Sequence, residues 1–161
     1  MSYTNSDGLY VLTFADQGAE QDKGTTVRGV VNTMIIDIPS FAALGTSFGA
    51  SNIDPLDPVI PANSLIINAD LVMTTAATSG GSATLTIGTY NSAGTAIDAD
   101  GIDATIALTA MDAIGEVVQC DGAQVNGTVT IGTAAAYVGL IYATAAFTAG
   151  AGKLIIQYIT P

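Results

Sequence analysis

The sequence predicts an all-β fold, either a sandwich or a barrel. Short stretches of β-branched and other apolar residues recur along it, Gly-rich turns separate them, and no 3.6-residue hydrophobic period is sustained. A length of 161 residues suits one domain with a hydrophobic core of its own. We therefore expect a single antiparallel β domain with one or two short helical turns.

The first part of the chain predicts two strands and a helical turn. Residues 9–14 form a candidate first strand, and the polar run over 15–24 is typical of a solvated loop or flexible arm. The β-branched run over 27–38 predicts a strand that ends at Pro39, because proline cannot donate a hydrogen bond to a sheet. A short helical turn is expected over residues 41–44.

The clearest strand signal lies over residues 65–74, where apolar and polar side chains alternate with a period of two. The predicted inward face consists of Leu65, Ile67, Ala69, Leu71 and Met73, and the more polar face of Ile66, Asn68, Asp70, Val72 and Thr74. A Gly- and Ser-rich turn follows, and a strand over 83–90 is expected to point Leu85 and Ile87 inward.

The second half predicts a loop, a helical turn and three strands. Residues 97–103 are expected to form an acidic loop. One or two helical turns are expected over 108–114, with Thr109 as the N-cap and Gly115 at the end. Further strands are predicted over 127–131, 137–147 and 153–160, with turns at 121–122 and 149–152.

The composition argues against catalysis. The chain has no His, no Trp, one Cys and three basic residues, against fourteen acidic ones, for a formal net charge of −11. Most enzymes need a tuned proton carrier or an activated nucleophile. The usual carrier is absent, and the Ser and Thr hydroxyls have no obvious base. We therefore expect no enzyme, and a hydrolase is the least favoured class.

The same charge balance disfavours nucleic acid and anionic membranes as partners, because a strongly acidic protein repels phosphate. The apolar stretch over 134–147 is shorter than the ~20 residues needed to cross a bilayer, so it predicts a buried strand. The first residues lack a basic or apolar leader, so we expect no secretory signal. Cys120 has no partner for an intramolecular disulfide and is expected to be a small packed side chain.

Asp98, Asp100 and Asp103 are the best candidate site, because they surround Gly101 with the hard oxygen ligands that Ca²⁺ prefers. The spacing lacks the spread and the terminal Glu of a helix-loop-helix calcium loop. An acidic turn in an acidic protein is the commoner explanation. We therefore expect no cofactor, with Ca²⁺ at these three aspartates as the alternative.

Three other features have structural explanations. Asp54 and Asp57 each precede a proline and are expected to form turns, not an acid–base pair. Asn126-Gly127-Thr128 matches a glycosylation acceptor, but Asn-Gly predicts a tight hairpin turn here. The six Tyr residues favour core or interface packing over stacking on sugars.

Two segments carry a family resemblance. In residues 60–88 a Pro-led turn enters a strand, a Thr-, Ala- and Gly-rich hairpin follows, and a strand over 84–88 returns. Residues 147–159 form a similar closing hairpin. Both resemble small structural proteins of tailed bacteriophages, namely capsid decoration (cement) proteins and head-fibre proteins. The similarity runs from about Pro61 to the C-terminus, and it consists of turn and strand chemistry, so it assigns no site residue.

The resemblance implies a β-sandwich of jelly-roll type over residues 27–161, preceded by an N-terminal strand or arm over 1–26 whose part from Ser2 to Lys23 would dock on the capsid. It implies a homotrimer that binds the major capsid protein on the outer surface of a phage head, made in the cytoplasm of the bacterial host. The alternative is a module that binds carbohydrate or the host surface, as in a fibre or an adhesin. The absence of Trp weakens this alternative.

Overall fold

The computed structural model describes residues 2–4, 10–12, 31–54 and 56–160. The chain divides into two compact units, Met1–Val31 and Asn32–Pro161. In the first unit, β1 (Ser2–Thr4) pairs antiparallel with β2 (Tyr10–Leu12). The second of these strands lies within the predicted strand over 9–14, whereas β1 was not predicted. The expected loop over 15–24 lies outside the described residues.

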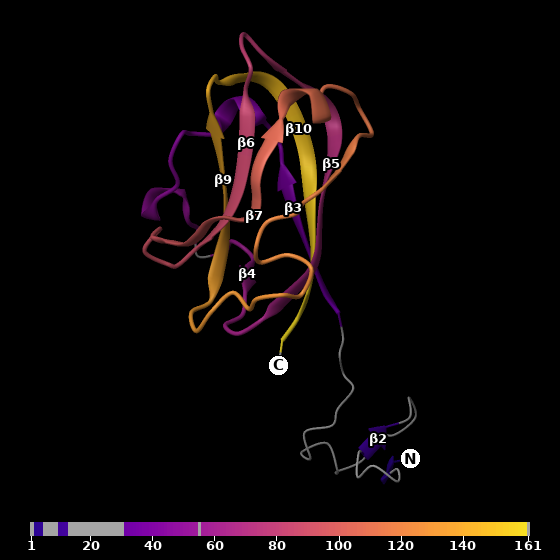
Figure 1. The fold of residues 1–161 in the computed structure, drawn as a ribbon. Coiled ribbons are helices and arrows are strands. Elements are labelled where there is room, and N and C mark those ends of the chain that lie inside the picture. Colours follow the sequence, from indigo (N-terminus) through magenta and orange to yellow (C-terminus); the bar gives the residue numbers. More distant parts are fainter. Residues whose placement is uncertain (1, 5–9, 13–30, 55, 161) are drawn as a thin grey trace. The chain divides into compact units, whose positions relative to one another are not determined.

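The second unit consists of two four-stranded antiparallel sheets (Figure 1). One sheet has the strand order β3 (Asn32–Ile38), β10 (Phe147–Ile159), β5 (Leu65–Ser79), β8 (Val117–Gln119). The other has the order β4 (Val59–Ile60), β9 (Ala136–Ala143), β6 (Thr84–Tyr90), β7 (Ala96–Ala107).

The strand pairing is nested. Strand β3 pairs with β10, β4 with β9, β5 with β8, and β6 with β7. One long hairpin, folded over into two sheets of four strands, produces this order, which is the jelly-roll topology. The prediction of an all-β sandwich of jelly-roll type is confirmed. Among the described residues, the helical content is limited to three 3₁₀ turns, η1 (Phe41–Ala43), η2 (Ala50–Asn52) and η3 (Leu108–Ala110).

The hydrophobic core lies between the two sheets. Leu71 of β5 and Leu154 and Ile156 of β10 are fully buried from one sheet, and Leu85 and Ile87 of β6 from the other. Phe41 of η1 packs edge-on against Phe147, with ring centroids 5.4 Å apart. The predicted inward positions of residues 83–90 and the helical turn near Phe41 are therefore confirmed.

The predicted faces of residues 65–74 are correct only from Ala69 onward. Ile66 is buried, and Ile67, predicted inward, is 37% exposed. The cause is a β-bulge: consecutive residues Gln157 and Tyr158 of β10 pair with Asn68 and Ile66, so Ile67 is an extra residue in β5. One extra residue moves every preceding side chain to the opposite face.

The predicted acidic loop over 97–103 was wrong, because these residues belong to β7. Ile87 and Thr89 of β6 pair with Asp103 and Asp98, so the β7 side of this interval holds extra residues that bulge out of the ladder. Gly88 lies opposite the bulge, and a Cβ there would come within 2.2 Å of the carbonyl oxygen of Ala99. The absence of a side chain at Gly88 therefore permits the bulged backbone to pack closely.

Three further predictions need correction. Residues 127–131 form no strand and only an isolated bridge, from Thr130 to Leu65. The predicted turn over 149–152 lies inside β10, and the chain instead reverses near Thr144, whose φ is +70°. The residue in the N-cap position of η3 is Ala107, not Thr109. The strands β4 and β8 and the turn η2 were missed because two or three residues show no periodicity.

Candidate functional site

The structure does not bring the three candidate metal ligands together as a ligand set. Burial is the main cause that raises the pKa of Asp98, and the neighbouring carboxyl group of Asp100 adds to the rise. Asp103 is only 4% exposed and accepts a hydrogen bond from the Thr105 backbone N–H over 3.0 Å. Within the described part of the chain, no three His, Cys, Asp or Glu side chains are grouped so that they could hold a metal ion.

Asp103 is a buried member of the three aspartates whose charges act on the thiol of Cys120. Burial is the main cause that raises the pKa of Asp103, and the charge of Asp121 adds to it. Cys120 is fully buried, and burial together with the charges of Asp103, Asp70 and Asp121 raises its pKa to about 12. A thiol with this pKa stays protonated at neutral pH and is a poor nucleophile. Its predicted role as a packed side chain is confirmed.

Tyr90 of β6 is influenced by the charge of Asp100 in the β7 bulge and packs against the segment around Phe48. The side chain is buried, and burial, with a smaller contribution from the charge of Asp100, raises its pKa. Its ring packs against Phe48, with centroids 4.5 Å apart. Phe48 and Tyr90 also cover Gly139 of β9, where a Cβ would come within 3 Å of both rings. The segment around Phe48 thus packs on this sheet.

Asp54 and Asp57 form a turn, as predicted. The Asp54 backbone N–H donates to Oδ2 of Asp57 over 2.8 Å, and Oδ1 of Asp54 accepts from the Leu56 backbone N–H over 2.8 Å. Asn126 and Gly127 both have positive φ, as a tight Asn-Gly turn requires. This turn connects no pair of strands among the described residues, so the predicted hairpin was wrong.

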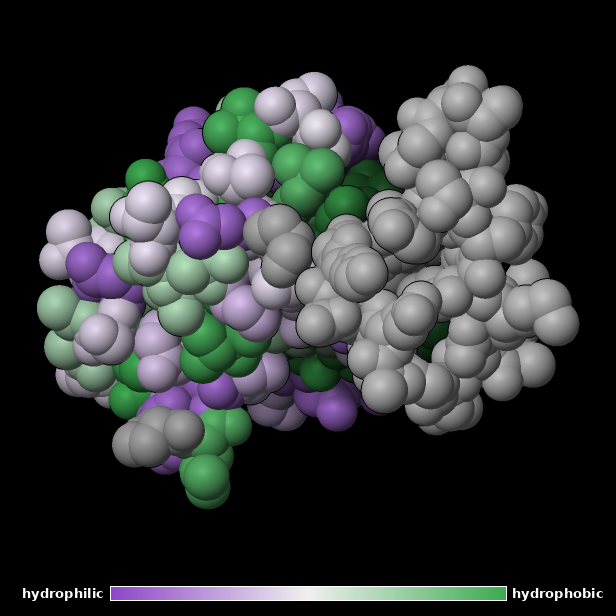
Figure 2. All heavy atoms as spheres, turned by 90° about the horizontal axis from the view of Figure 1, so that it is seen from below, coloured by the Kyte–Doolittle hydropathy of each residue, from purple (hydrophilic) through white to green (hydrophobic). Residues whose placement is uncertain are grey.

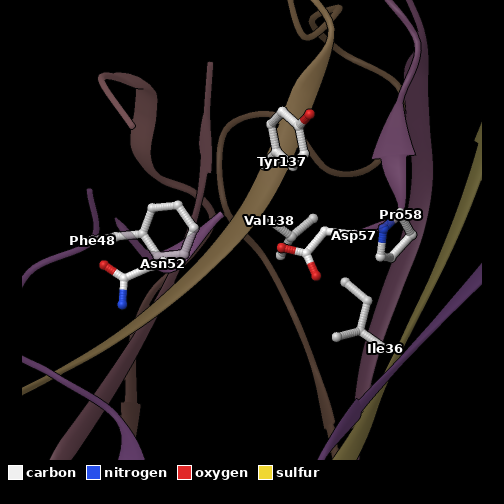
Figure 3. A pocket seen from close by; sticks show the side chains of 7 residues that line it. All are labelled: Ile36, Phe48, Asn52, Asp57, Pro58, Tyr137 and Val138. Carbon is white, nitrogen blue, oxygen red and sulfur yellow. The ribbon is translucent and has the colours of Figure 1, made fainter. Parts of the chain in front are cut away.

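A pocket of about 180 Å³ lies beside β3 and β9 (Figure 3). Its lining combines apolar, aromatic and acidic side chains: Ile36 of β3, Tyr137 and Val138 of β9, and Phe48, Asn52, Asp57 and Pro58 of the connecting segment. Sequence reasoning missed this site because four of the residues lie on an irregular segment and the others are distant in sequence. Asp57 was noticed only as a turn residue.

The outer face of the β3-β10-β5-β8 sheet mixes apolar and charged side chains. Ile35 of β3 is 57% exposed and lies beside Ile155, and Val117 of β8 is 60% exposed and lies beside Val72. Lys153 forms an ion pair with Asp37 over 2.7 Å on the same face. Figure 2 shows, from another side, hydrophobic side chains interspersed with hydrophilic ones. Among the described residues, no helix is long and apolar enough to span a membrane.

No protein-family model and no curated protein sequence matches this chain. Two chains in solved structures do match it. A chain in the structure entitled "Capsid of Ralstonia phage GP4" superposes with a TM-score of 0.55 and 20% sequence identity, over 81% of this chain and 84% of that one. The two chains share one fold. A chain of the "Acidic stable capsid structure of Helicobacter pylori bacteriophage KHP30" has a TM-score of 0.45 and 12% identity, over 81% and 94% of the chains.

The Ralstonia phage match bears on the resemblance drawn from residues 60–88 and 147–159. Those segments predicted the fold of small phage structural proteins, and a chain from a phage capsid structure has that fold. The resemblance is therefore confirmed for the fold.

Proposed function

We propose that this chain is a structural protein of a phage virion that decorates the outer surface of the head as a homotrimer and stabilises the shell. The observation that carries the proposal is the fold shared with a chain of the Ralstonia phage GP4 capsid structure over about four-fifths of both chains. The resemblance of the Pro61-to-C-terminus region to decoration and head-fibre proteins supports the specific role.

The side-chain chemistry agrees with a role in contact, not reaction. The chain has no His, and its one thiol is buried with a pKa raised to about 12. One carboxylate oxygen of Asp54 and one of Asp57 accept hydrogen bonds within the turn. These features supply neither a proton carrier nor an activated nucleophile, which favours a structural role.

Stabilisation would come from mass action. A trimer that contacts three neighbouring capsid subunits gains effective concentration for its second and third contacts. A protein that binds the assembled shell but not its separated subunits shifts the equilibrium toward the shell. The net charge of −11 favours a basic surface on the major capsid protein as the partner.

Two measurements test the proposal. Light scattering of the purified chain, with and without a chelator, should give three times its 16.1 kDa mass in both conditions. Heads of the phage that encodes the chain, prepared without it, should then bind it in a pelleting assay and resist heat better with it. A monomer that does not sediment with these heads would refute the proposal. Binding to a glycan array in place of heads would favour the carbohydrate-binding alternative.

A further inference from the structure

We propose that the pocket lined by Ile36, Phe48, Asn52, Asp57, Pro58, Tyr137 and Val138 receives an arginine side chain of a partner protein. This inference rests on the proposed function, in which the partner is the shell protein of the head. The pocket would then be the place where the basic surface of the shell protein contacts this chain.

The walls of the pocket fit the apolar stem of such a side chain. Ile36, Pro58 and Val138 provide aliphatic surface, and the rings of Phe48 and Tyr137 lie on the walls. Long basic side chains bury their methylene stems on surfaces of this kind while the charged group reaches a polar atom. A guanidinium also packs favourably against aromatic rings.

The Asp57 carboxylate supplies the charge. Figure 3 shows it between the side chains of Val138 and Ile36, on the lining of the pocket. Its Oδ2 atom accepts the Asp54 N–H, which fixes the orientation of the carboxylate. Oδ1 accepts no hydrogen bond from the described residues. Because an ionised carboxylate binds two donors well, this second oxygen suits a guanidinium N–H.

The described part of the chain does not supply the cation. Lys153 is its only basic residue, and it pairs with Asp37 on the outer face of the β3-β10-β5-β8 sheet. Ile36, the next residue to Asp37, lines the pocket from β3. A net charge of −11 attracts a basic partner from a distance. Arginine fits better than lysine, because its planar fork combines ring packing with directed hydrogen bonds to a carboxylate.

The test is a titration of the ¹⁵N-labelled full chain followed by NMR. The probe is N-acetyl-arginine methylamide, and N-acetyl-citrulline methylamide is its neutral control of nearly equal shape. The arginine probe should shift backbone signals near Phe48, Asp57 and Tyr137, whereas the citrulline probe should bind about tenfold more weakly, because it lacks the charge-assisted bond. Asp57→Asn keeps an oxygen for the Asp54 N–H and should weaken arginine binding by a similar factor.

Asp112→Asn is the matched charge control, because Asp112 is exposed on the loop between η3 and β8. It should leave arginine binding unchanged. Equal binding of the two probes, shifts located elsewhere, or no effect of Asp57→Asn would overturn the inference. Arginine binding that appears only in a Lys23→Gln, Arg28→Gln double variant would also overturn it, because the chain's own cations would then be the occupants.

The outcome is separable from that of the proposed function. If the arginine probe binds at Asp57 but the chain does not adhere to heads, the pocket stands and the decoration role fails. If the wild-type chain adheres to heads and Asp57→Asn adheres equally, the role stands and the pocket is not its arginine contact.

Discussion

The hydroxyl of Thr89 donates a hydrogen bond to Oε1 of Gln124 over 2.8 Å, and both side chains are buried. Thr89 lies on β6, and Gln124 lies on the loop that follows β8. The bond therefore joins a buried residue of the β4-β9-β6-β7 sheet to the loop that follows β8, a strand of the other sheet. The Gln124 backbone N–H also donates to the carbonyl of Gly101 in the β7 bulge, over 2.8 Å.

Thr89→Val should lower the free energy of unfolding by about 1–3 kcal/mol, because it keeps the shape of the side chain but leaves a buried amide oxygen without its donor. Urea denaturation monitored by circular dichroism measures the change. Thr89→Ser retains the hydroxyl and loses a methyl group, so it should cost less than Thr89→Val. A valine variant as stable as the wild type would show that the bond contributes no net stability.

Gly88→Ala should destabilise the chain by about 2 kcal/mol or more, because a Cβ would lie 2.2 Å from the carbonyl oxygen of Ala99, and backbone cannot yield as a flexible side chain can. The matched control is Gly80→Ala, since a Cβ at Gly80 meets nothing within 4 Å. The control should change stability by less than about 0.5 kcal/mol. Equal thermal midpoints for the two variants would contradict the argument.

The sequence predicted the sandwich because its long central strands alternate clearly. Residues 69–73 and 83–90 have the period expected of strands with one buried face, and the structure buries Leu71, Leu85 and Ile87. The jelly-roll topology was inferred only from the resemblance. Strand order depends on contacts between distant residues, such as Val59 with Tyr137, which periodicity does not report.

The failures occur at bulges and at the pocket. Ile67 cannot be recognised as an extra residue without knowing that Gln157 and Tyr158 pair across it. Residues 97–103 looked like a loop because strands seldom carry so many carboxylates. They nevertheless belong to β7, and Gly88 of the paired strand β6 leaves room for the β7 bulge. The pocket combines Ile36, Asp57 and Tyr137, which lie far apart in the sequence. The pairing of β4 with β9 brings Asp57 near Tyr137, and Ile36 comes from a strand of the other sheet.

Thr144→Asn should stabilise the chain by about 1 kcal/mol. Thr144 has φ of +70° in the turn between β9 and β10, a conformation that β-branched residues tolerate poorly and Asn tolerates well. Differential scanning calorimetry should show a higher midpoint. Thr74→Asn is the control, because Thr74 is exposed within β5, where Asn is less favourable than Thr. The control should lower the midpoint, and a lower midpoint for Thr144→Asn as well would refute the strain argument.

The buried carboxyl of Asp103 should make the chain more stable in mild acid than at neutral pH. Burial raises its pKa in the folded state above the ordinary 3.8. The unfolded chain therefore binds fewer protons in the window between these two values. The contribution of Asp103 to stability is full below the unfolded pKa and is lost as the pH rises through the folded pKa. Protonation also relieves repulsion by Asp121, the nearby charge that adds to the rise.

Asp103→Asn should therefore reduce the gain in the free energy of unfolding when the pH falls from 7 toward 4. The amide retains an oxygen for the Thr105 N–H, so the fold should tolerate it. Urea denaturation across this pH range measures the slope, and Asp112→Asn, which removes an exposed carboxylate, controls for the change in net charge. If both variants reduce the slope equally, the pH dependence reflects net charge alone, and the burial of Asp103 is not its cause.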